Sequence, residues 1–538
     1  MELESSKQST EQKPAKIGKY VMICTIIATV SSTLLGYDIG IMSGALLFVS
    51  HDLHLNLVQQ EIVVGSLNLI SIVGGAMAGR LSDWIGRRLT MAIAAAIFFA
   101  GAAIMAGSPS FGVLLLGRLV AGIGVGFALM IAPVYSAELS PARIRGSLVS
   151  LTEVFINFGI LLGYLVSFAL EGLPSTYNWR LMLGIGMLPA LLLAAGVLVM
   201  PESPRWLATQ RRTPEARTVL IKTSNGNVSE ANMRLAEILQ TIGFDDSVDP
   251  TRDPTTEEYD NAIGKAKKQG QGVWRELLIK PTPAIRRMLL CALGLHFFQQ
   301  ACGIDAAVYY SPVVFGEAGV HSKLGKLGAT VGVGFCKFIF IFIATFLLDH
   351  VGRKPLLLTS AAGVTLSLFT VGTAFILLKI NTTEGDTLVS LNTASRQAAA
   401  SGVGAGITIF AICAYVALFS IGFGPVAWVF VSEIFPLRLR AQAVGLCVVT
   451  NRLISGTIAL TFLSISQAIT PAGTFFLYGS IVFLSIIFFA VFMPETKGKT
   501  LEELAVFFEG RHSPSATTAE PAPPPGLQKT TYPNPEKH

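Results

Sequence analysis

The sequence contains few charged residues: Asp, Glu, Lys and Arg make up only 14% of its 538 residues. Soluble domains are about one quarter charged, so this composition excludes an ordinary soluble protein. Hydrophobic residues account for 51% of the chain, and the mean hydropathy is +0.59. The net charge of +6 does not suggest binding to nucleic acid. The chain is therefore expected in a membrane, with lipid around it.

Patterns for metal, disulfide or enzymatic chemistry are also missing. No pair of cysteines forms a CxxC, and all six fall inside apolar runs, where they read as small buried hydrophobes: Cys24, Cys291, Cys302, Cys336, Cys413 and Cys447. We find no phosphate-binding loop and no nucleophile–base grouping. The sequence thus predicts neither an enzyme nor an ATP-driven pump, and no metal or cofactor.

Long apolar runs fill most of the chain. A helix needs about 20 residues to cross a bilayer, and twelve runs are long enough: 20–48, 61–79, 89–107, 112–134, 147–170, 181–200, 285–316, 327–348, 355–378, 402–431, 442–468 and 472–493. We therefore predict an all-α membrane protein with twelve transmembrane helices.

The loops between these runs repeat after six spans. Gly-Arg-Arg at 86–88 returns as Gly-Arg-Lys at 352–354, and Pro-Glu-Ser at 201–203 returns as Pro-Glu-Thr at 494–496. A Glu at 138 with two arginines downstream likewise returns at 433. This duplication predicts two six-helix halves, an arrangement that suits alternating access.

Basic residues gather in alternate loops, nine in one set against five in the other, which places the richer set and both termini in the cytosol. The expected segments are a cytosolic tail at 1–19, a first half at 20–200, a cytosolic linker with short helices at 201–284, a second half at 285–493 and a cytosolic tail at 494–538, mostly disordered after 510.

One apolar run holds an unusual set of polar residues, Gln299, Gln300, Asp305, Tyr309 and Tyr310. Polar groups are costly in hydrocarbon unless they have partners, so these side chains should face a protein interior or a wet cavity. Amides and a carboxylate at helical spacing suit a solute rich in hydroxyl groups. We therefore predict a solute site halfway through a membrane transporter.

Four motifs together resemble the sugar porter family of the major facilitator superfamily: Gly-Arg-Leu-Ser-Asp-x-x-Gly-Arg-Arg at 79–88, Pro-Glu-Ser-Pro-Arg-Trp-Leu at 201–207, Gln-Gln-x-x-Gly-Ile at 299–304 and Pro-Glu-Thr-Lys-Gly at 494–498. The resemblance covers about residues 20–508. Within the family the chain looks most like plant polyol/monosaccharide–proton symporters, because of Gln-Gln-Ala-Cys-Gly-Ile-Asp at 299–305 and Asn-Arg at 451–452.

The resemblance implies a set of sugar contacts: Glu153, Gln299, Gln300, Asp305, Lys337, Trp428 and Asn451. The sequence departs from the usual hexose pattern at four positions. Positions 153, 305 and 337 usually carry amides and are charged here, and position 452 is usually aromatic and is Arg here. Two aromatic side chains are further candidates, Phe423 beside Trp428 and Tyr309 on the outer side, although either could simply pack.

Asp38 and Arg118 each lie within an apolar run, and the resemblance assigns them to proton coupling. A pair that closes and parts with conformation changes its proton affinity by state, as coupling requires. The alternative is a fixed structural ion pair. Glu153 could be a second proton site, bind substrate, or pair with Arg452 across the cavity.

Asp305 and Lys337 replace two neutral amides with opposite charges, so they could pair with each other. A buried pair of this kind is tolerable only if it is well bonded. The pair could clamp two helices together, or it could present a carboxylate and an ammonium group to the hydroxyl groups of a polyol. Both readings stay open.

Acids and bases recur together at the inner ends of the helices, and they predict salt-bridge clusters that hold the inner side shut in the outward-facing state: Asp83, Arg87, Arg88, Glu138, Arg145, Asp349, Arg353, Glu433 and Arg440. Exposed pairs are weak, so such clusters must be partly buried to matter. The alternative is topology signalling by the positive charges alone.

The expected function is proton-coupled symport of polyols and monosaccharides (sorbitol, mannitol, xylitol, myo-inositol, hexoses) by alternating access, with the proton as coupling ion and no cofactor. The alternatives are a uniporter of the same fold and a sugar sensor. A monomer is expected. The resemblance implies the plasma membrane, with the vacuolar membrane as the alternative.

Overall fold

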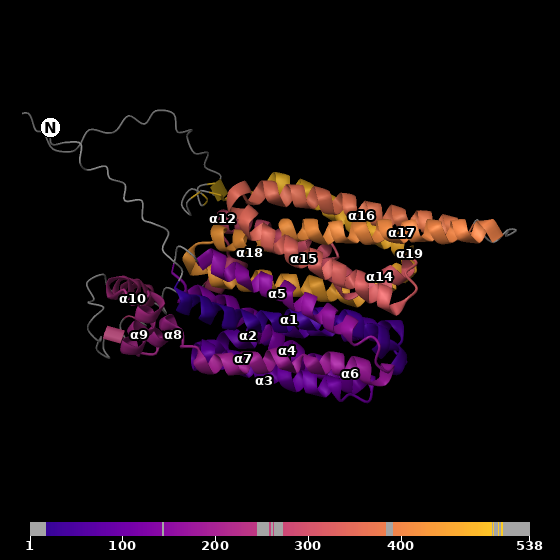
Figure 1. Cartoon of the computed structure of the whole chain (residues 1–538). Coiled ribbons are helices and arrows are strands. Elements are labelled where there is room, and N and C mark those ends of the chain that lie inside the picture. Colours follow the sequence, from indigo (N-terminus) through magenta and orange to yellow (C-terminus); the bar gives the residue numbers. More distant parts are fainter. Residues whose placement is uncertain are drawn as a thin grey trace, which may run out of the picture.

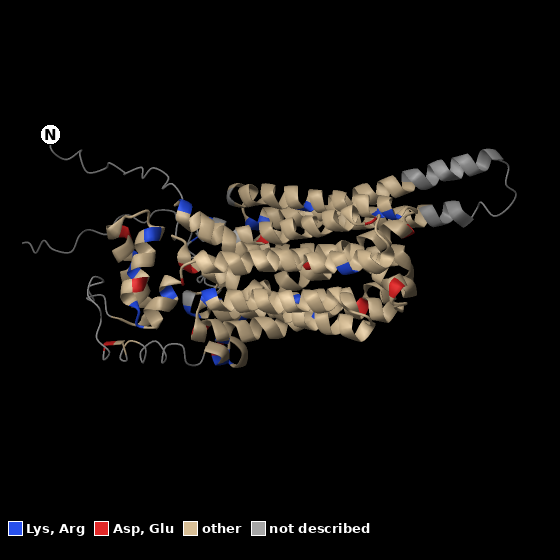
Figure 2. Ribbon diagram, turned by 60° about the horizontal axis from the view of Figure 1, so that its bottom comes forward, with Lys and Arg blue, Asp and Glu red and all other residues tan. Residues whose placement is uncertain are grey.

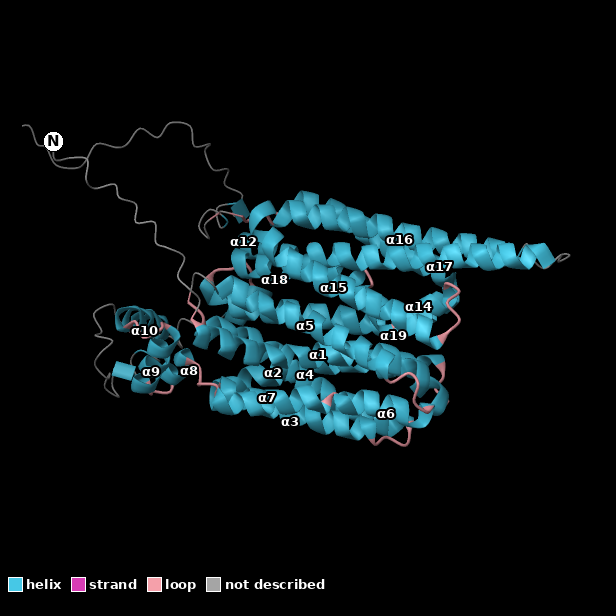
Figure 3. Ribbon diagram, viewed as in Figure 1, coloured by secondary structure: helices cyan, strands magenta, loops and turns pink. Residues whose placement is uncertain are grey.

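The computed structural model describes residues 18–141, 145–244, 273–383 and 391–497, and isolated positions at 258–259, 262, 499, 504 and 507–508. Within these residues all the regular structure is helical (Figure 3). Helices are the expected solution for long apolar segments, because every backbone polar group is then bonded inside its own segment.

The first half contains six membrane spans: α1 (Lys19–Asp52), α2 (Leu57–Ile85), α3 (Arg87–Ala106), α4 (Phe111–Leu139), α5 (Arg145–Ala169), and α6 (Ser175–Ile185) with α7 (Met187–Val199). The last two form one span interrupted at Gly186. Figure 1 shows this half in indigo to magenta.

Three short helices follow at one end of the bundle, which we name the linker end (Figure 1): α8 (Pro204–Thr209), α9 (Thr213–Thr223) and α10 (Val228–Ile242). In α10 the buried residues Ala231, Leu235, Leu239 and Ile242 recur every three or four positions, so one face of an amphipathic helix is covered. The opposite end of the bundle is named the far end.

The second half begins after a π-helical turn, η2 (Arg275–Ile279). It contains α12 (Pro283–Ala301), α13 (Ile304–Tyr309), α14 (Ser311–Glu317), α15 (Lys323–Val351), α16 (Arg353–Thr383), α17 (Leu391–Ile421), α18 (Phe423–Ile434) and α19 (Leu437–Phe492).

The predicted twelve spans and two six-helix halves are confirmed over the described residues. Ten helices are long and apolar enough to cross a membrane. The helix α19 supplies two spans, since its backbone leaves the helical region at Thr470 (φ 72°, ψ 156°) just before Pro471. The remaining span is the broken series α12–α14. The expected limits of the tails and the linker stay a prediction, and the disorder expected after residue 510 lies outside the described residues.

Helix breaks occur beside the predicted solute site. Gly303 separates α12 from α13 with φ 82°, in the left-handed region that glycine adopts without strain, and a Cβ there would lie 2.9 Å from the Tyr478 ring. Gly422 precedes α18, whose third residue is Pro425. Such breaks free backbone carbonyls for side-chain donors, which membrane helices tolerate only inside protein or at a cavity.

Glycines let α1 and α5 pack backbone to backbone. A Cβ on Gly36 would lie 1.9 Å from the Ile156 carbonyl oxygen, and one on Gly40 would lie 2.2 Å from that of Ile160. Small residues at such interfaces allow close approach in lipid. This packing fixes α1 and α5, which carry Asp38 and Glu153, against each other.

The two halves meet toward the far end. There α2 packs against α19, where Leu460 fills the space at Gly65, and α5 packs against α15, where Tyr164 fills the space at Gly334. Charged residues concentrate near the two ends, and the helix surfaces between them are almost entirely uncharged (Figure 2). Exposed side chains such as Leu198, Leu366 and Phe410 suit contact with lipid.

Candidate functional site

A cavity of about 80 Å³, partly open to solvent, lies between the two halves. Its wall is built from α1, α4 and α5 of the first half and from α12, α13, α15, α17, α18 and α19 of the second. All seven sugar contacts implied by the sequence line it, together with Arg452: Glu153, Gln299, Gln300, Asp305, Lys337, Trp428 and Asn451.

Three amides form a hydrogen-bonded network in this wall. The Asn451 Nδ2 group donates to Gln299 Oε1 at 2.8 Å, and Gln300 Nε2 donates to Asn451 Oδ1 at 3.2 Å. Gln299 is braced in turn, because its Nε2 group donates to the carbonyl oxygens of Phe423 at 2.9 Å and Gly424 at 3.3 Å, at the break before α18. Gln300 Oε1 is buried and has no partner among the described residues, so it is an unsatisfied acceptor in the wall of the cavity.

Arg452 belongs to the same network. Its Nε and Nη2 groups donate to Asn451 Oδ1 at 3.0 and 2.7 Å, while Nη1 has no partner in the described part of the chain. No ion pair within 4.0 Å joins Arg452 to Glu153 in that part. The guanidinium therefore orients the Asn451 amide and leaves one buried donor unsatisfied in the wall.

Two acids and two bases line the cavity, so its formal charge is balanced: Glu153, Asp305, Lys337 and Arg452. Asp305 accepts a hydrogen bond from Ser455 Oγ. Lys337 lies within electrostatic range of Asp305 and Glu153, but no ion pair within 4.0 Å joins it to either in the described residues. The arrangement presents separated charges, which can both donate to and accept from neutral hydroxyl groups.

Trp428 adds an aromatic face to the wall. Its Nε1 group lies beside Glu153 without a hydrogen bond of ordinary geometry. Its ring meets the ring of His296 edge to face, with 5.0 Å between centroids and 68° between planes. An indole face can pack on sugar C–H groups while its N–H donates.

His296 was missed by the sequence reasoning. It is fully buried, and its Nδ1 atom lies 3.4 Å from Asn451 Nδ2, behind the amide network. Its position three residues before Gln299 in an apolar run is a signal that could have found it, because residues three apart share a helix face.

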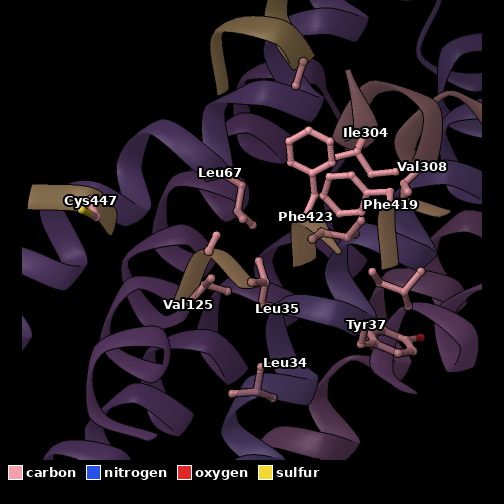
Figure 4. Close-up of a cluster of buried hydrophobic side chains, with 14 of the residues drawn as sticks. Leu34, Leu35, Tyr37, Leu67, Val125, Ile304, Val308, Phe419, Phe423 and Cys447 are labelled. Atoms are coloured by element: carbon pink, nitrogen blue, oxygen red, sulfur yellow. The ribbon is translucent and has the colours of Figure 1, made fainter. Parts of the chain in front are cut away.

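Tyr309 and Phe423 are placed differently from the other candidates: neither belongs to the described lining of the cavity. The Phe423 ring stacks on Phe419, with 5.7 Å between centroids (Figure 4). It also meets the ring of Phe489 edge to face. Tyr309 is fully buried, with no described partner for its hydroxyl group, within electrostatic range of Asp38 and Asp305. Substrate contact by these two residues stays a prediction.

Asp38 and Arg118 form a buried ion pair. Arg118 Nη1 donates to both Asp38 oxygens at 2.7 Å, and the exposed fractions of the two side chains are 2% for Asp38 and 0% for Arg118. Arg118 also donates from Nε to the Val63 carbonyl at 2.8 Å and from Nη2 to the Val64 carbonyl at 3.2 Å. The guanidinium thus ties α1, α2 and α4 together.

A cluster at the linker end joins three helices of the first half, α2, α3 and α4, to the start of the linker. Arg87 donates to the two Glu138 oxygens at 3.0 and 3.1 Å and lies 3.2 Å from Asp83. Ser203 Oγ donates to Glu138 at 2.6 Å. Arg87 and Glu138 are only 12% and 9% exposed, so this pair has the partial burial that the prediction required.

Glu202 caps the N-terminus of α3. Its carboxylate accepts from the backbone N–H groups of Arg87 at 2.9 Å and Arg88 at 3.2 Å, where the helix dipole favours an anion. Gly86, with φ 96°, is required here, because a Cβ would lie 2.3 Å from Glu202 Oε2. Burial raises the pKa of Glu202 above its ordinary value, against the lowering effect of the N–H groups of Ser203, Arg88 and Arg87.

The second half repeats this cluster. Arg353 donates to Glu433 at 2.7 Å, and Thr496 Oγ1 donates to the other Glu433 oxygen at 2.6 Å. Glu495 accepts from the N–H groups of Arg353 at 3.0 Å and Lys354 at 2.9 Å, as Glu202 does in the first half.

The pKa of Glu495 moves in the other direction from that of Glu202. Burial would raise it, but the backbone N–H groups of Lys497, Arg353, Lys354 and Thr496 outweigh burial and hold it below its ordinary value. Glu202 lies deeper, so there desolvation prevails over a similar set of donors.

The remaining predicted gate residues are placed as follows. Arg88 donates to the carbonyl oxygens of Val197 and Leu198 near the end of α7, and Arg440 donates to that of Phe435. The side chains of Arg145 and Asp349 lie outside the described residues. The described ion pairs between predicted gate residues each join residues of the same half: Asp83–Arg87, Arg87–Glu138 and Arg353–Glu433. A gating role for them stays a prediction.

The sequence reasoning used the Pro-Glu-Ser and Pro-Glu-Thr motifs as markers of duplication and of the family resemblance, and it gave their side chains no partners. Their side chains are structural partners of the clusters, Glu202 and Ser203 in one half and Glu495 and Thr496 in the other. The repeat was a signal that could have found these contacts. A Pro-Glu motif and a Gly-Arg motif both recur in the second half, so the acid of the first is expected to contact the second.

Comparison with known proteins agrees with the fold. The family model described as Sugar (and other) transporter matches residues 24–508. Polyol transporter 5 of Arabidopsis thaliana is 48% identical over 529 residues, with 97% of this chain and 92% of that protein covered. Glucose transporter GlcP of Staphylococcus epidermidis is 33% identical, with 91% and 97% covered.

Solved structures of the xylose transporter XylE from E. coli are similar over most of the chain. Its partially occluded inward open conformation gives a TM-score of 0.70 at 28% identity, covering 90% of this chain and all of that one. A structure described as the proton:xylose symporter bound to 6-bromo-6-deoxy-D-glucose gives a TM-score of 0.68 at 28% identity, covering 91% of this chain and 99% of that one.

Proposed function

The chain belongs to the family of sugar (and other) transporters, multi-pass membrane proteins that are not enzymes, and on that premise we propose that it is a proton-coupled symporter of polyols and monosaccharides. The expected substrates are sorbitol, mannitol, xylitol, myo-inositol and hexoses. The names of its relatives, polyol transporters and a glucose transporter, support this range.

The observation that carries the proposal is the amide network of the central cavity. Asn451, Gln299 and Gln300 hold one another in fixed orientations, and unpartnered atoms of Gln300, Trp428 and Arg452 remain in the wall. A site that offers both donors and acceptors matches a hydroxyl-rich solute, and it disfavours an analogue that leaves those buried groups unpaired.

Proton coupling is assigned to Asp38 with Arg118, and Glu153 is the second candidate. An arginine stays charged throughout, so Asp38 carries the change in protonation if the ion pair opens during the cycle. Asp38 and Glu153 lie on the closely packed helices α1 and α5, so a movement of one helix displaces the other. The description of XylE as a proton:xylose symporter supports this assignment.

One observation favours a uniporter as the second candidate. Arg118 is anchored not only to Asp38 but also to two backbone carbonyls of α2. A guanidinium held by three helices would suit a permanent structural pair. In a uniporter of this kind the Asp38 carboxylate would stay ionised through the whole cycle.

The linker end is assigned to the cytosol, with both termini, and the far end to the outside, as the distribution of basic loops requires. We place the protein in the plasma membrane, with the vacuolar membrane as the alternative. It acts as a monomer, with the proton as coupling ion and no cofactor.

The test is substrate-evoked current in voltage-clamped oocytes that express the full chain or its Asp38→Asn variant. Sorbitol, myo-inositol and glucose are applied at acid and neutral external pH. For a symporter we expect inward currents that grow with acidity in the wild type and are lost in Asp38→Asn, while the variant still reaches the surface. The order of the currents ranks the substrates.

Tracer uptake in the same cells separates the candidates. Uptake without current and without pH dependence would overturn proton coupling and leave the uniporter. A chain that reaches the surface and carries neither current nor tracer would overturn transport itself. The sugar sensor would then be the remaining hypothesis.

A further inference from the structure

A second buried acid lies away from the central cavity, on the seam between the two halves. Glu61 is in the second turn of α2, and its side chain is only 3% exposed. Both of its oxygens are bonded to one residue of the other half: Ser464 N–H donates to Oε1 at 2.7 Å, and Ser464 Oγ donates to Oε2 at 2.6 Å. Coupling by the Asp38–Arg118 pair makes no use of this contact.

The contact lies on a tightly packed stretch of α2 and α19. Below it, toward the middle of the membrane, Leu460 occupies the space at Gly65, where a Cβ would lie 2.5 Å from its Cγ. Farther down, Leu69 occupies the space at Gly456 in the same way, at 2.6 Å. The two helices therefore fit closely along this line in the present structure.

A surface hollow lies directly over the contact. It is lined by Asn56, Leu57 and Val58 from the start of α2 and by Ser464, Gln467 and Ala468 from α19. Ser464 thus has the hollow on one side and Glu61 on the other. A path from the far end toward the central cavity along this seam can open only if Glu61 and Ser464 separate.

The contact lowers the free energy of the protein only in the arrangement in which α19 lies against α2. An ionised or polar carboxyl group loses its hydration when it is buried, and the two donors of Ser464 replace the water. If the halves separate here, the carboxyl group regains water and the bonds are lost. Ser464 can supply these donors only when α19 lies against α2.

We propose that Glu61 and Ser464 form a latch that holds the far end of the two halves together, and that Glu61 thereby sets the balance between the states open to either end. This inference rests on the proposed transport by alternating access. It adds a residue to that cycle that contacts neither the solute nor the Asp38–Arg118 pair.

The test measures access to the cavity and does not depend on which substrate is carried. Ser420 lines the cavity, so a Ser420→Cys reporter is introduced into the full chain. The rate of its modification by a membrane-impermeant methanethiosulfonate is measured from each face, in right-side-out and inside-out vesicles. The rate of the chain without the reporter is subtracted, to remove the native cysteines.

In the reporter background, Glu61→Ala is expected to raise the labelling rate from the far-end face at least tenfold. Ser464→Ala, which removes one of the two donors and keeps the volume of the seam, should raise it about threefold. Glu61→Gln should have a similar effect, because its amide oxygen still accepts the Ser464 N–H. The matched control is Glu317→Ala, which removes an exposed acid at the same end.

The possible outcomes distinguish the proposed latch from the alternating access on which it rests. If substrate changes reporter labelling between the two faces while Glu61→Ala and Ser464→Ala label like the parent, the latch is wrong and alternating access stands. If neither substrate nor any variant changes labelling of a chain that reaches the membrane, alternating access fails, and the latch with it. If Glu317→Ala matches Glu61→Ala, the effect comes from surface charge and the latch is again wrong.

Discussion

Asn451 is the residue on which most of the polar groups of the cavity wall depend. Its amide gives one hydrogen bond to Gln299 and receives bonds from Gln300 and Arg452. It is fully buried, so water does not readily replace these partners when the amide is removed. The orientation of the neighbouring side chains therefore rests on a single side chain.

Replacing Asn451 with Ala is expected to weaken substrate binding. Each buried polar group left unpaired costs about 1–3 kcal/mol, so KM for sorbitol or glucose should rise at least tenfold, with a smaller change in maximal rate. Tracer uptake over a range of substrate concentrations measures both. The matched control is Thr450→Ala, one position earlier. Among the described residues, the Thr450 hydroxyl bonds only to Leu446 of its own helix. Equal KM values in the two variants would contradict a central role for Asn451.

At the scale of elements, the close packing of α1 on α5 decides where the ionisable residues lie. Gly159 of α5 faces the backbone of α1, where a Cβ would meet the Thr33 carbonyl oxygen at 2.6 Å and the Tyr37 nitrogen at 2.7 Å. Backbone atoms cannot turn aside as a flexible side chain can. Any side chain at position 159 therefore has to push the two helices apart.

The substitution Gly159→Ala should lower stability by about 1–3 kcal/mol through overpacking, with a lower melting temperature in detergent and slower transport. Gly112→Ala in α4 is the control, since no atom of the described residues lies within 4 Å of its Cβ position, and there the alanine should be neutral or slightly stabilising. A Gly159→Ala chain as stable as the control would show that the α1–α5 contact is looser than the structure has it.

At the scale of the whole molecule, the two halves repeat side-chain hydrogen bonds as well as sequence motifs. Arg87, Glu138 and Ser203 in the first half correspond to Arg353, Glu433 and Thr496 in the second. Each set ties the ends of helices within its own half. In this conformation the two clusters make each half rigid and leave the contact between halves to the far end.

Two substitutions test this independence. Glu138→Gln and Glu433→Gln should each cost about 1.5–3 kcal/mol by removing a charged acceptor, and together they should add to within about 0.5 kcal/mol, because they share no partner. Thermal unfolding of the single and double variants in detergent gives the comparison. A clear departure from additivity would mean that the clusters act as one gate across the halves.

The sequence predicted the cavity wall more completely than its internal bonding. Gln299, Gln300 and Asn451 could be named because amides are rare in apolar runs and because the motifs resemble a known family. Their mutual hydrogen bonds could not be derived, because residues about 150 positions apart meet only through helix packing. For the same reason the sequence suggested a Glu153–Arg452 pair, whereas Arg452 donates to Asn451 in the structure.

The sequence by itself determined the membrane class, the twelve spans and the two halves, because the length of an apolar run and the period of a repeat are local properties of the chain. Only the tertiary structure decided which side chains of different helices meet: Arg118 with Asp38, Glu202 with the start of α3, and Glu61 with Ser464. The physical reason is that hydropathy is set residue by residue. A hydrogen bond between helices depends instead on their rotation, depth and spacing, which the packing of glycines and side chains fixes jointly.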